Sequence, residues 1–307
     1  MKIIKPKFWE KKNNLISYIL LPVSFFLKII IKIKNKFISP QSYKLPIICV
    51  GNIYLGGTGK TPLVIKIYDE LYKHKAAVIK KFYYSHQDEI NLTKHYVNNF
   101  FINKSRVDAI NEAIKKKSKL IILDDGMQDP NINADINIIC FKTSKLIGNG
   151  FTLPSGPLRE PLNSVKKCNF VVINGKKDKK FENKLLEIHP YIKIYYSKYL
   201  PVNHKNLRGK RVLAFCGIGN SDDFYDILEK NRIKILKRYS FPDHYDFKDE
   251  DLKKIKFEAK KEKLMIITTE KDYFRIKNKD KKNIKFLKIK LAIENEKRFF
   301  EEIKKFL

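Results

Sequence analysis

The chain has 307 residues, enough for two domains with separate cores, and it carries 64 lysine and arginine residues against 33 aspartate and glutamate residues. The net charge of +31 is weak evidence for a nucleic acid partner, because the lysines are spread over the whole chain among many isoleucine and asparagine residues. The four cysteines form no Cys-x-x-Cys pair and three lie in apolar runs, which argues against a zinc or disulfide framework and favours a reducing, cytoplasmic compartment.

The N-terminal segment predicts a helix that lies in a membrane surface. Residues 15–27 are strongly apolar, and residues 28–36 mix isoleucine with lysine. A spanning helix needs about 20 uninterrupted apolar residues, and Pro22 and Lys28 interrupt this run. No small-residue cleavage site follows, as a secretory signal would require. Lysines facing anionic headgroups fit an interfacial segment, and the alternative is a core helix packed on the first domain.

Residues 46–71 contain a strand, a glycine loop and a helix in succession. Residues 47–50 have the length and β-branched content of a buried strand, and a helix follows from Lys60, with Pro62 in its first turn. The loop between them ends in Gly-Lys-Thr. This combination is typical of the phosphate-binding loop of nucleoside-triphosphate enzymes.

The residue types of this loop suit a triphosphate. Its glycines can adopt positive φ and let backbone N–H groups approach phosphate oxygens. The predicted nucleotide-binding residues are Gly56, Gly57, Thr58, Gly59, Lys60 and Thr61. Lys60 would reach the β- and γ-phosphates, and the Thr61 hydroxyl would hold magnesium. The strict pattern has a glycine where this chain has Tyr54, and the alternative is a glycine turn before a helix that happens to begin with Lys-Thr.

Polar residues follow a second predicted strand at residues 76–79. Ligands bind at the carboxyl ends of parallel strands, which makes His86, Asp88 and Glu89 candidates for acid–base chemistry. The alternative is a solvated loop before a helix at residues 90–94.

A third apolar strand, at residues 119–123, ends in Asp124-Asp125-Gly126. Carboxylates beside a phosphate loop are what a magnesium site requires, and the glycine permits a sharp turn. The sequence therefore predicts that Asp124 and Asp125 organise a metal, against the alternative of an ordinary acidic turn. A further strand is expected at residues 134–141.

Residues 148–161 contain three glycines and three prolines, which predicts a rigid, irregular loop. Arg159 in this loop would stabilise charge on a transferring phosphate, and Glu160 would join the metal ligands. A plain domain linker is the alternative.

The second half of the chain predicts another α/β unit. Its expected strands are residues 170–173, 212–216 and 264–269, with a helix at 222–230 and a solvated turn at 176–180. Strands alternating with helices imply a parallel sheet with covered faces. We therefore expect an N-terminal segment at 1–36, a phosphate-loop domain at 37–165 and an α/β domain at 166–307.

These motifs, in this order, resemble the tetraacyldisaccharide 4'-kinase family, which phosphorylates the distal sugar of a lipid disaccharide in the lipid A pathway. The matching segments are residues 50–62, 124–128, 148–150, 154–161, 215–220, 241–245 and 269–272. They span nearly the whole chain, the glycine–proline loop is distinctive of the family, and Tyr54 is shared with it. The resemblance implies an α/β fold with a P-loop NTPase-like parallel sheet domain, a second, smaller α/β domain and an N-terminal membrane-associating helix.

The resemblance also implies an activity and the residues that carry it. The activity is transfer of the γ-phosphate of ATP to the 4'-hydroxyl of a tetraacyldisaccharide 1-phosphate, with Mg²⁺. The implied catalytic residues are Asp88, His244, Lys60 and Arg159, and the implied metal residues are Thr61, Asp124, Asp125 and Glu160. Asp88 lies where the family has its catalytic aspartate, and His244 where a histidine partners it. This chain departs from the family around Asp88, because the flanking glycine and proline are lost and residues 81–84 replace Arg-Gly-Tyr-Gly.

The implied partners are a lipid A disaccharide precursor and an anionic membrane surface, with no nucleic acid. The implied protein is a monomer, bound as a peripheral or monotopic protein at the cytoplasmic face of the inner membrane.

Two other classes of protein share parts of this pattern. A P-loop GTPase or ATPase switch that assembles or delivers a partner also joins Gly-Lys-Thr to an Asp-x-x-Gly turn. Its guanine-reading motif would be Asn-Lys-x-Asp, and residues 269–272 have glutamate in place of the asparagine. A basic nucleic-acid-binding protein would rely on charge alone, without an aromatic-basic recognition motif.

Overall fold

The computed structural model describes residues 6–243 and 245–307, which fall into two units. Unit 1 contains the residues up to Lys81, Asn99–Lys198 and Ile293–Leu307, and unit 2 contains Phe82–Asn98 and Tyr199–Ala292. The chain changes unit within two strands, β7 (Lys193–Pro201) and β12 (Ile289–Ile293), and at both ends of Phe82–Asn98. These limits differ from the expected ones at 37–165 and 166–307, because residues 166–198 and Ile293–Leu307 belong to unit 1 and Phe82–Asn98 belongs to unit 2.

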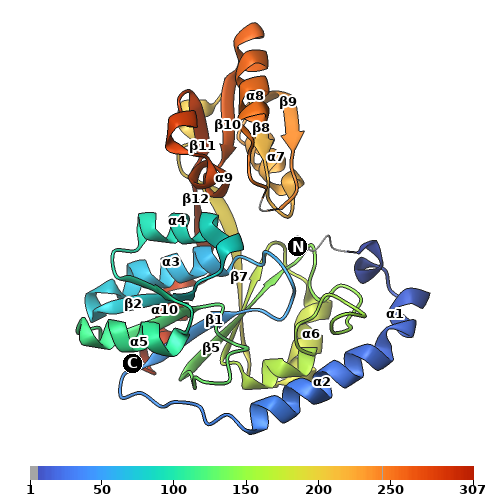
Figure 1. The fold of residues 1–307 in the computed structure, drawn as a ribbon, viewed down its shortest axis with the longest axis vertical. Coiled ribbons are helices and arrows are strands. Elements are labelled where there is room, and N and C mark those ends of the chain that lie inside the picture. The colour runs from blue at the N-terminus through green and yellow to red at the C-terminus, as the bar shows by residue number, and fades with distance from the viewer. Residues whose placement is uncertain (1–5, 244) are drawn as a thin grey trace. The chain divides into compact units, whose positions relative to one another are not determined.

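Unit 1 is built on a sheet with the strand order β12-β7-β6-β5-β1-β4-β2-β3. Figure 1 labels β1, β2, β5, β7 and β12 of this sheet. The neighbouring pairs from β7 to β3 are parallel. Strands β1 and β4 are buried along their whole length, as strands covered on both faces are. Besides β7 and β12, the strands of this sheet are β1 (Ile47–Gly51), β2 (Ala76–Lys81), β3 (Phe100–Asn103), β4 (Leu120–Asp124), β5 (Ile136–Lys142) and β6 (Phe170–Asn174). The predicted parallel α/β sheet is thus confirmed.

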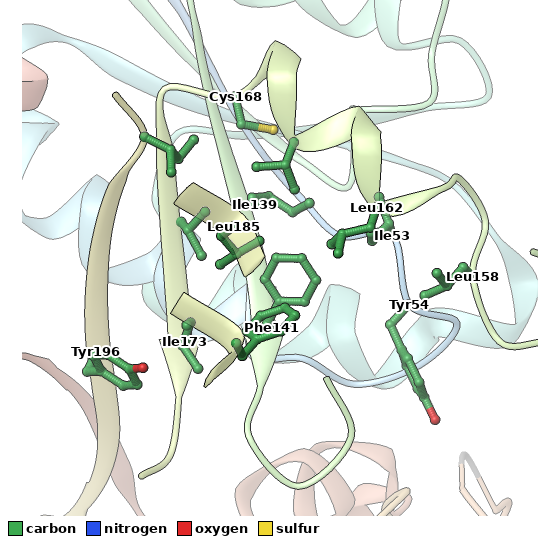
Figure 2. Close-up of a cluster of buried hydrophobic side chains, with 14 residues drawn as sticks. Ile53, Tyr54, Ile139, Phe141, Leu158, Leu162, Cys168, Ile173, Leu185 and Tyr196 are labelled. Atoms are coloured by element: carbon green, nitrogen blue, oxygen red, sulfur yellow. The ribbon is translucent and has the colours of Figure 1, made fainter. Parts of the chain in front are cut away.

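Unit 1 contains two buried apolar clusters, to which strands and helices both contribute. One contains Tyr54, Phe141 and Leu158, and Figure 2 shows it. The other surrounds Ile47 and Ile121. The helices are α1 (Leu15–Ile19), α2 (Leu21–Lys36), α3 (Lys60–Leu71), α5 (Arg106–Lys115), α6 (Lys179–Ile188) and α10 (Glu296–Lys304), with 3-10 turns at Lys7–Glu10, Tyr72–His74 and Leu162–Lys167. Because α6 begins at Lys179, the expected turn at residues 176–180 is shorter than predicted.

Helices α1 and α2 bury serines and expose apolar side chains. Ser17 and Ser24 are 0% and 4% exposed, whereas Phe25 and Phe26 are 61% and 64% exposed. The Ser24 hydroxyl lies 2.7 Å from that of Ser155, in the glycine–proline loop. A helix packed in the core would instead bury its apolar side chains and expose its polar ones. Within residues 6–243 and 245–307, none of the helices combines the length and apolar character needed to span a bilayer.

Unit 2 contains a four-stranded parallel sheet with the order β11-β10-β8-β9. Its strands and helices are β8 (Arg211–Cys216), β9 (Lys234–Ser240), β10 (Met265–Thr269), β11 (Ile284–Leu287), α4 (Gln87–Tyr96), α7 (Ser221–Lys230), α8 (Asp249–Lys261) and α9 (Glu270–Arg275), with 3-10 turns at Tyr84–His86, His204–Leu207 and Asn278–Asp280. Helix α4 starts earlier than the helix expected at 90–94. Asp88 therefore lies in its first turn.

Candidate active site

The phosphate loop connects β1 to α3 within unit 1. Gly56 and Gly59 have φ angles of 134° and 95°, a region that glycine adopts without strain. Gly57 does not use this freedom, and a Cβ there would meet nothing within 4 Å. No side chain of the described residues caps the start of α3, which has 12 residues. The positive end of the α3 dipole lies at this loop, and no side-chain cap from the described part of the chain competes with an anion for its free N–H groups. This end of the helix therefore favours a bound anion.

Asn52 organises this loop from inside. Its buried Nδ2 donates to the carbonyl oxygens of Tyr54 at 2.7 Å and Gly56 at 3.0 Å, and to Thr58 Oγ1 at 2.9 Å. Gln128 Nε2 in turn donates to the Asn52 carbonyl oxygen at 3.0 Å. Our sequence interpretation gave neither residue a role, although a polar residue directly after a buried strand was an available signal.

Tyr54 occupies the place of the usual first glycine because its side chain is part of the core. It is 1% exposed and belongs to the same cluster as Leu158, as Figure 2 shows. Burial raises the pKa of Tyr54 to about 12, so its hydroxyl stays neutral. The loop geometry is set by this anchor in addition to the glycines.

The glycine–proline loop pairs with the phosphate loop through its backbone. Leu55 N donates to the Pro157 carbonyl oxygen at 2.8 Å, and Arg159 N donates to that of Ile53 at 2.6 Å. The predicted irregular loop is therefore no mere linker, because it places Arg159 beside the phosphate-binding segment.

Asp124, the last residue of β4, is fully buried and pairs in register with Lys80 of β2. Thr61 Oγ1 donates to its Oδ2 at 3.2 Å, and Lys80 Nζ lies 2.5 Å from the same oxygen. Its Oδ1 is buried and has no hydrogen-bond partner among the described residues. A carboxylate oxygen left unsatisfied beside a threonine hydroxyl provides the hard oxygen donors that Mg²⁺ prefers, so Asp124 and Thr61 fit this ion.

Asp125 forms ion pairs with Lys60 and Arg159, the two cations predicted to stabilise the transferring phosphate. Its Oδ1 lies 3.5 Å from Lys60 Nζ, and both of its carboxylate oxygens lie 3.0 Å from Arg159 Nη1. Burial alone would raise the pKa of Asp125, but Lys60 and Arg159 outweigh it and lower the pKa below its ordinary 3.8. The ion pairs therefore stabilise the fold above that pH, and their contribution is lost as the pH falls below it. Arg106 holds the Asp125 carbonyl oxygen and, at 2.8 Å, the Asp129 carboxylate.

Glu160 acts electrostatically on Cys168, which follows the 3-10 turn Leu162–Lys167. Burial and, to a smaller degree, Glu160 raise the pKa of the Cys168 thiol to about 12. In the part of the chain that the structure describes, no three His, Cys, Asp or Glu side chains are grouped to hold a metal. Metal ligation by Asp125 and Glu160 thus stays a prediction, and Asp124 is the carboxylate whose surroundings fit it best.

Asp88 lies in unit 2, where cations surround it. Its side chain is 2% exposed, and its Oδ2 lies 2.5 Å from Arg275 Nη2 and 3.4 Å from Lys271 Nζ. Lys271 Nζ also lies 3.2 Å from Glu89 Oε1. His244, the other residue predicted from the resemblance, falls outside the described residues. The role of both as an acid–base pair stays a prediction.

Comparisons with known proteins place the chain in a family. The family model described as tetraacyldisaccharide-1-P 4'-kinase matches residues 16–96 and 88–307. The tetraacyldisaccharide 4'-kinase of Pelagibacter ubique is 44% identical over 97% of this chain and 96% of the relative, and that of Rickettsia bellii is 31% identical over 99% and 98%. The crystal structure of LpxK from Aquifex aeolicus in complex with ATP has the same fold, with a TM-score of 0.73 at 24% identity over 95% of this chain and 99% of that one. The chain belongs to the tetraacyldisaccharide-1-P 4'-kinase family.

Proposed function

We propose that this protein transfers the γ-phosphate of ATP to the 4'-hydroxyl of a tetraacyldisaccharide 1-phosphate, a lipid A precursor. One observation carries the proposal. Lys60 and Thr61 after the phosphate loop, and Arg159 from the glycine–proline loop, converge on the adjacent carboxylates Asp124 and Asp125. This arrangement combines an anion-binding loop with fixed cations. The identity of the acceptor is inferred from the family to which the chain belongs.

Each of these side chains has a task in such a transfer. Lys60 and Arg159 would offset the negative charge that spreads over the transferring phosphoryl group. Asp125 holds both cations in place. Asp124 and Thr61 would hold magnesium, which would supply positive charge against the phosphates of the nucleotide. Asp88, partnered by His244, would accept the proton of the sugar hydroxyl.

The activity can be measured directly. We expect the purified full-length chain to move label from γ-labelled ATP into tetraacyldisaccharide 1-phosphate in mixed micelles, and to transfer it much more slowly from GTP. Release of labelled inorganic phosphate without label in the lipid would contradict the proposal. A reaction without added lipid serves as the control.

Residues 269–272 give no support to a guanine-reading switch. Asp272 is fully buried, and its Oδ2 accepts hydrogen bonds from Thr269 Oγ1 at 2.6 Å and Gly217 N at 3.0 Å. Lys271 is engaged by Asp88 and Glu89. A guanine-reading aspartate must instead present its carboxylate to the base, so this segment serves the structure of unit 2.

We also propose that α1 and α2 rest on an anionic membrane surface, at the cytoplasmic face of the inner membrane. Full burial of a leucine, isoleucine or phenylalanine side chain is worth about 1.5–3 kcal/mol, so a row of exposed ones is unfavourable in water. The lysines of α2 suit anionic headgroups. The exposed apolar residues are Leu15, Ile16, Ile19, Val23, Phe25, Phe26, Leu27, Ile29, Ile30, Ile31, Ile33 and Phe37.

Charge introduced into this row should release the protein from vesicles. We expect the double variant Phe26→Glu, Ile30→Glu to sediment roughly tenfold less with phosphatidylethanolamine–phosphatidylglycerol vesicles than the natural chain. The unfolding temperature should not change, because both side chains are exposed. Phe257→Glu is the matched control, since Phe257 is 69% exposed on α8. Undiminished sedimentation of the double variant would show that the row is no membrane contact.

A further inference from the structure

The guanidinium of Arg275, at the end of α9, is enclosed within unit 2. Its side chain is 7% exposed. Nη1 donates to the carbonyl oxygens of Gly217 at 3.2 Å and Tyr245 at 3.0 Å, and to Asp272 Oδ1 at 3.0 Å. Nη2 donates to Asp88 Oδ2 at 2.5 Å. A planar fork of donors makes such divergent contacts possible, and a lysine could not reproduce them.

These hydrogen bonds join two segments that are far apart in the sequence. Asp88 belongs to α4, and Tyr245 belongs to the segment between β9 and α8. Tyr245 directly follows His244 in the sequence. One guanidinium therefore fixes both the proposed proton acceptor and the backbone next to its proposed partner.

Asp272 keeps this guanidinium in place. Its Oδ2 is occupied by Thr269 Oγ1 and Gly217 N, which leaves Oδ1 to bind Arg275. The chain of contacts therefore runs from the start of α9 through Asp272 and Arg275 to Asp88. Each side chain in it is buried, so each has little freedom to reorient.

We propose that Arg275 is a positioning residue for the phosphoryl transfer. It orients the Asp88 carboxylate and holds the backbone carbonyl oxygen of Tyr245, so that the proton acceptor keeps one geometry. This inference rests on the proposed function. A buried ion pair contributes little net stability after its desolvation, so fixed geometry is the better reason for this one. Displacing a reacting group by about 1 Å can cost about 10²-fold in rate.

A variant of Lys271 allows the effect of positive charge near Asp88 to be compared with the positioning effect proposed for Arg275. Its Nζ lies 3.4 Å from Asp88 Oδ2 and 3.2 Å from Glu89 Oε1. Both of these partners lie on α4, and the Asp243 carboxylate, in the segment between β9 and α8, also raises the pKa of Lys271. Lys271→Met removes a positive charge near Asp88 while the guanidinium of Arg275 stays in the chain.

The test compares Arg275→Lys, Arg275→Met and Lys271→Met by steady-state kinetics and by the pH profile of kcat/KM. We expect Arg275→Met to lower kcat by about 10²-fold with the KM for ATP unchanged. The acidic limb of its profile should move to higher pH, because a carboxylate that loses a nearby cation is ionised less readily. Lys271→Met should move this limb with a smaller loss of kcat. Arg238→Met is the control, since Arg238 forms an exposed ion pair with Glu229 in the same unit.

A double-variant cycle with Asp88→Asn decides the interpretation. If Arg275 acts through Asp88, Arg275→Met should lower kcat by less than about twofold in the Asp88→Asn background. Additive losses would overturn the positioning role, and so would native kcat in the Arg275 variants while Asp88→Asn is inactive. Native turnover of Asp88→Asn would overturn the proton-acceptor assignment and this role with it. If Arg275→Met does not fold, Arg275→Lys decides, because its native kcat would equally overturn the role.

Discussion

Lys60→Ala is expected to lower kcat for phosphoryl transfer by about 10³-fold. The ammonium group of Lys60 lies 3.5 Å from Asp125, in a site where it is 13% exposed and therefore poorly screened by water. In the variant, no ammonium group at the start of α3 offsets the negative charge on the transferring phosphate. The measurement is label transfer from ATP to the lipid acceptor at saturating concentrations of both.

A second lysine of the same helix provides the control. Lys66 forms an ion pair with Glu296 at 2.7 Å, away from the phosphate loop along α3. Lys66→Ala should therefore leave kcat unchanged within about twofold, since a partly exposed pair is worth about 1 kcal/mol or less and only to stability. If both variants keep native kcat, the phosphate-binding role of Lys60 is wrong.

Asp88→Asn should lower kcat by about 10²- to 10⁴-fold, because an amide of the same shape cannot accept a proton. The KM for ATP should stay near its natural value, since the predicted nucleotide-binding residues belong to unit 1 and Asp88 to unit 2. Kinetics with varied ATP and varied lipid separate the two parameters.

Asp249→Asn is the matched control for this substitution. Asp249 is another carboxylate in the first turn of a helix of unit 2, and its partner Lys279 lies 3.3 Å away at the surface. Its variant should retain native kcat. A similar loss in both variants would point to general destabilisation, and native kcat in Asp88→Asn would rule out its role as proton acceptor.

The sequence was sufficient to predict the phosphate loop because contiguous residues make it. Lys60 and Thr61 follow a glycine loop and a buried strand, and each of these has a local pattern. The contact of Thr61 with Asp124 could be anticipated only as the start of a helix meeting the end of a neighbouring strand. The contact of Lys80 with Asp124 could not, because it depends on the register of β2 against β4.

The surroundings of Asp88 show the limit of local patterns more clearly. Asp88 and Arg275 are 187 positions apart, and no periodicity relates α4 to α9. The same is true of the serines in α1 and α2, whose burial depends on the loop that they meet. The sequence predicted that apolar residues of these helices face a membrane surface, but the contacts of their serines with the glycine–proline loop followed only from the structure.

The balance of charge around Asp124 and Asp125 has a consequence for the order in which ligands arrive. Lys80 already neutralises Asp124, and Lys60 and Arg159 together exceed the charge of Asp125. Among these five residues, three cations accompany two anions, so this group attracts a polyphosphate more strongly than a free divalent metal. We therefore expect magnesium to bind together with the nucleotide, because the phosphates supply the negative charge that these protein residues lack.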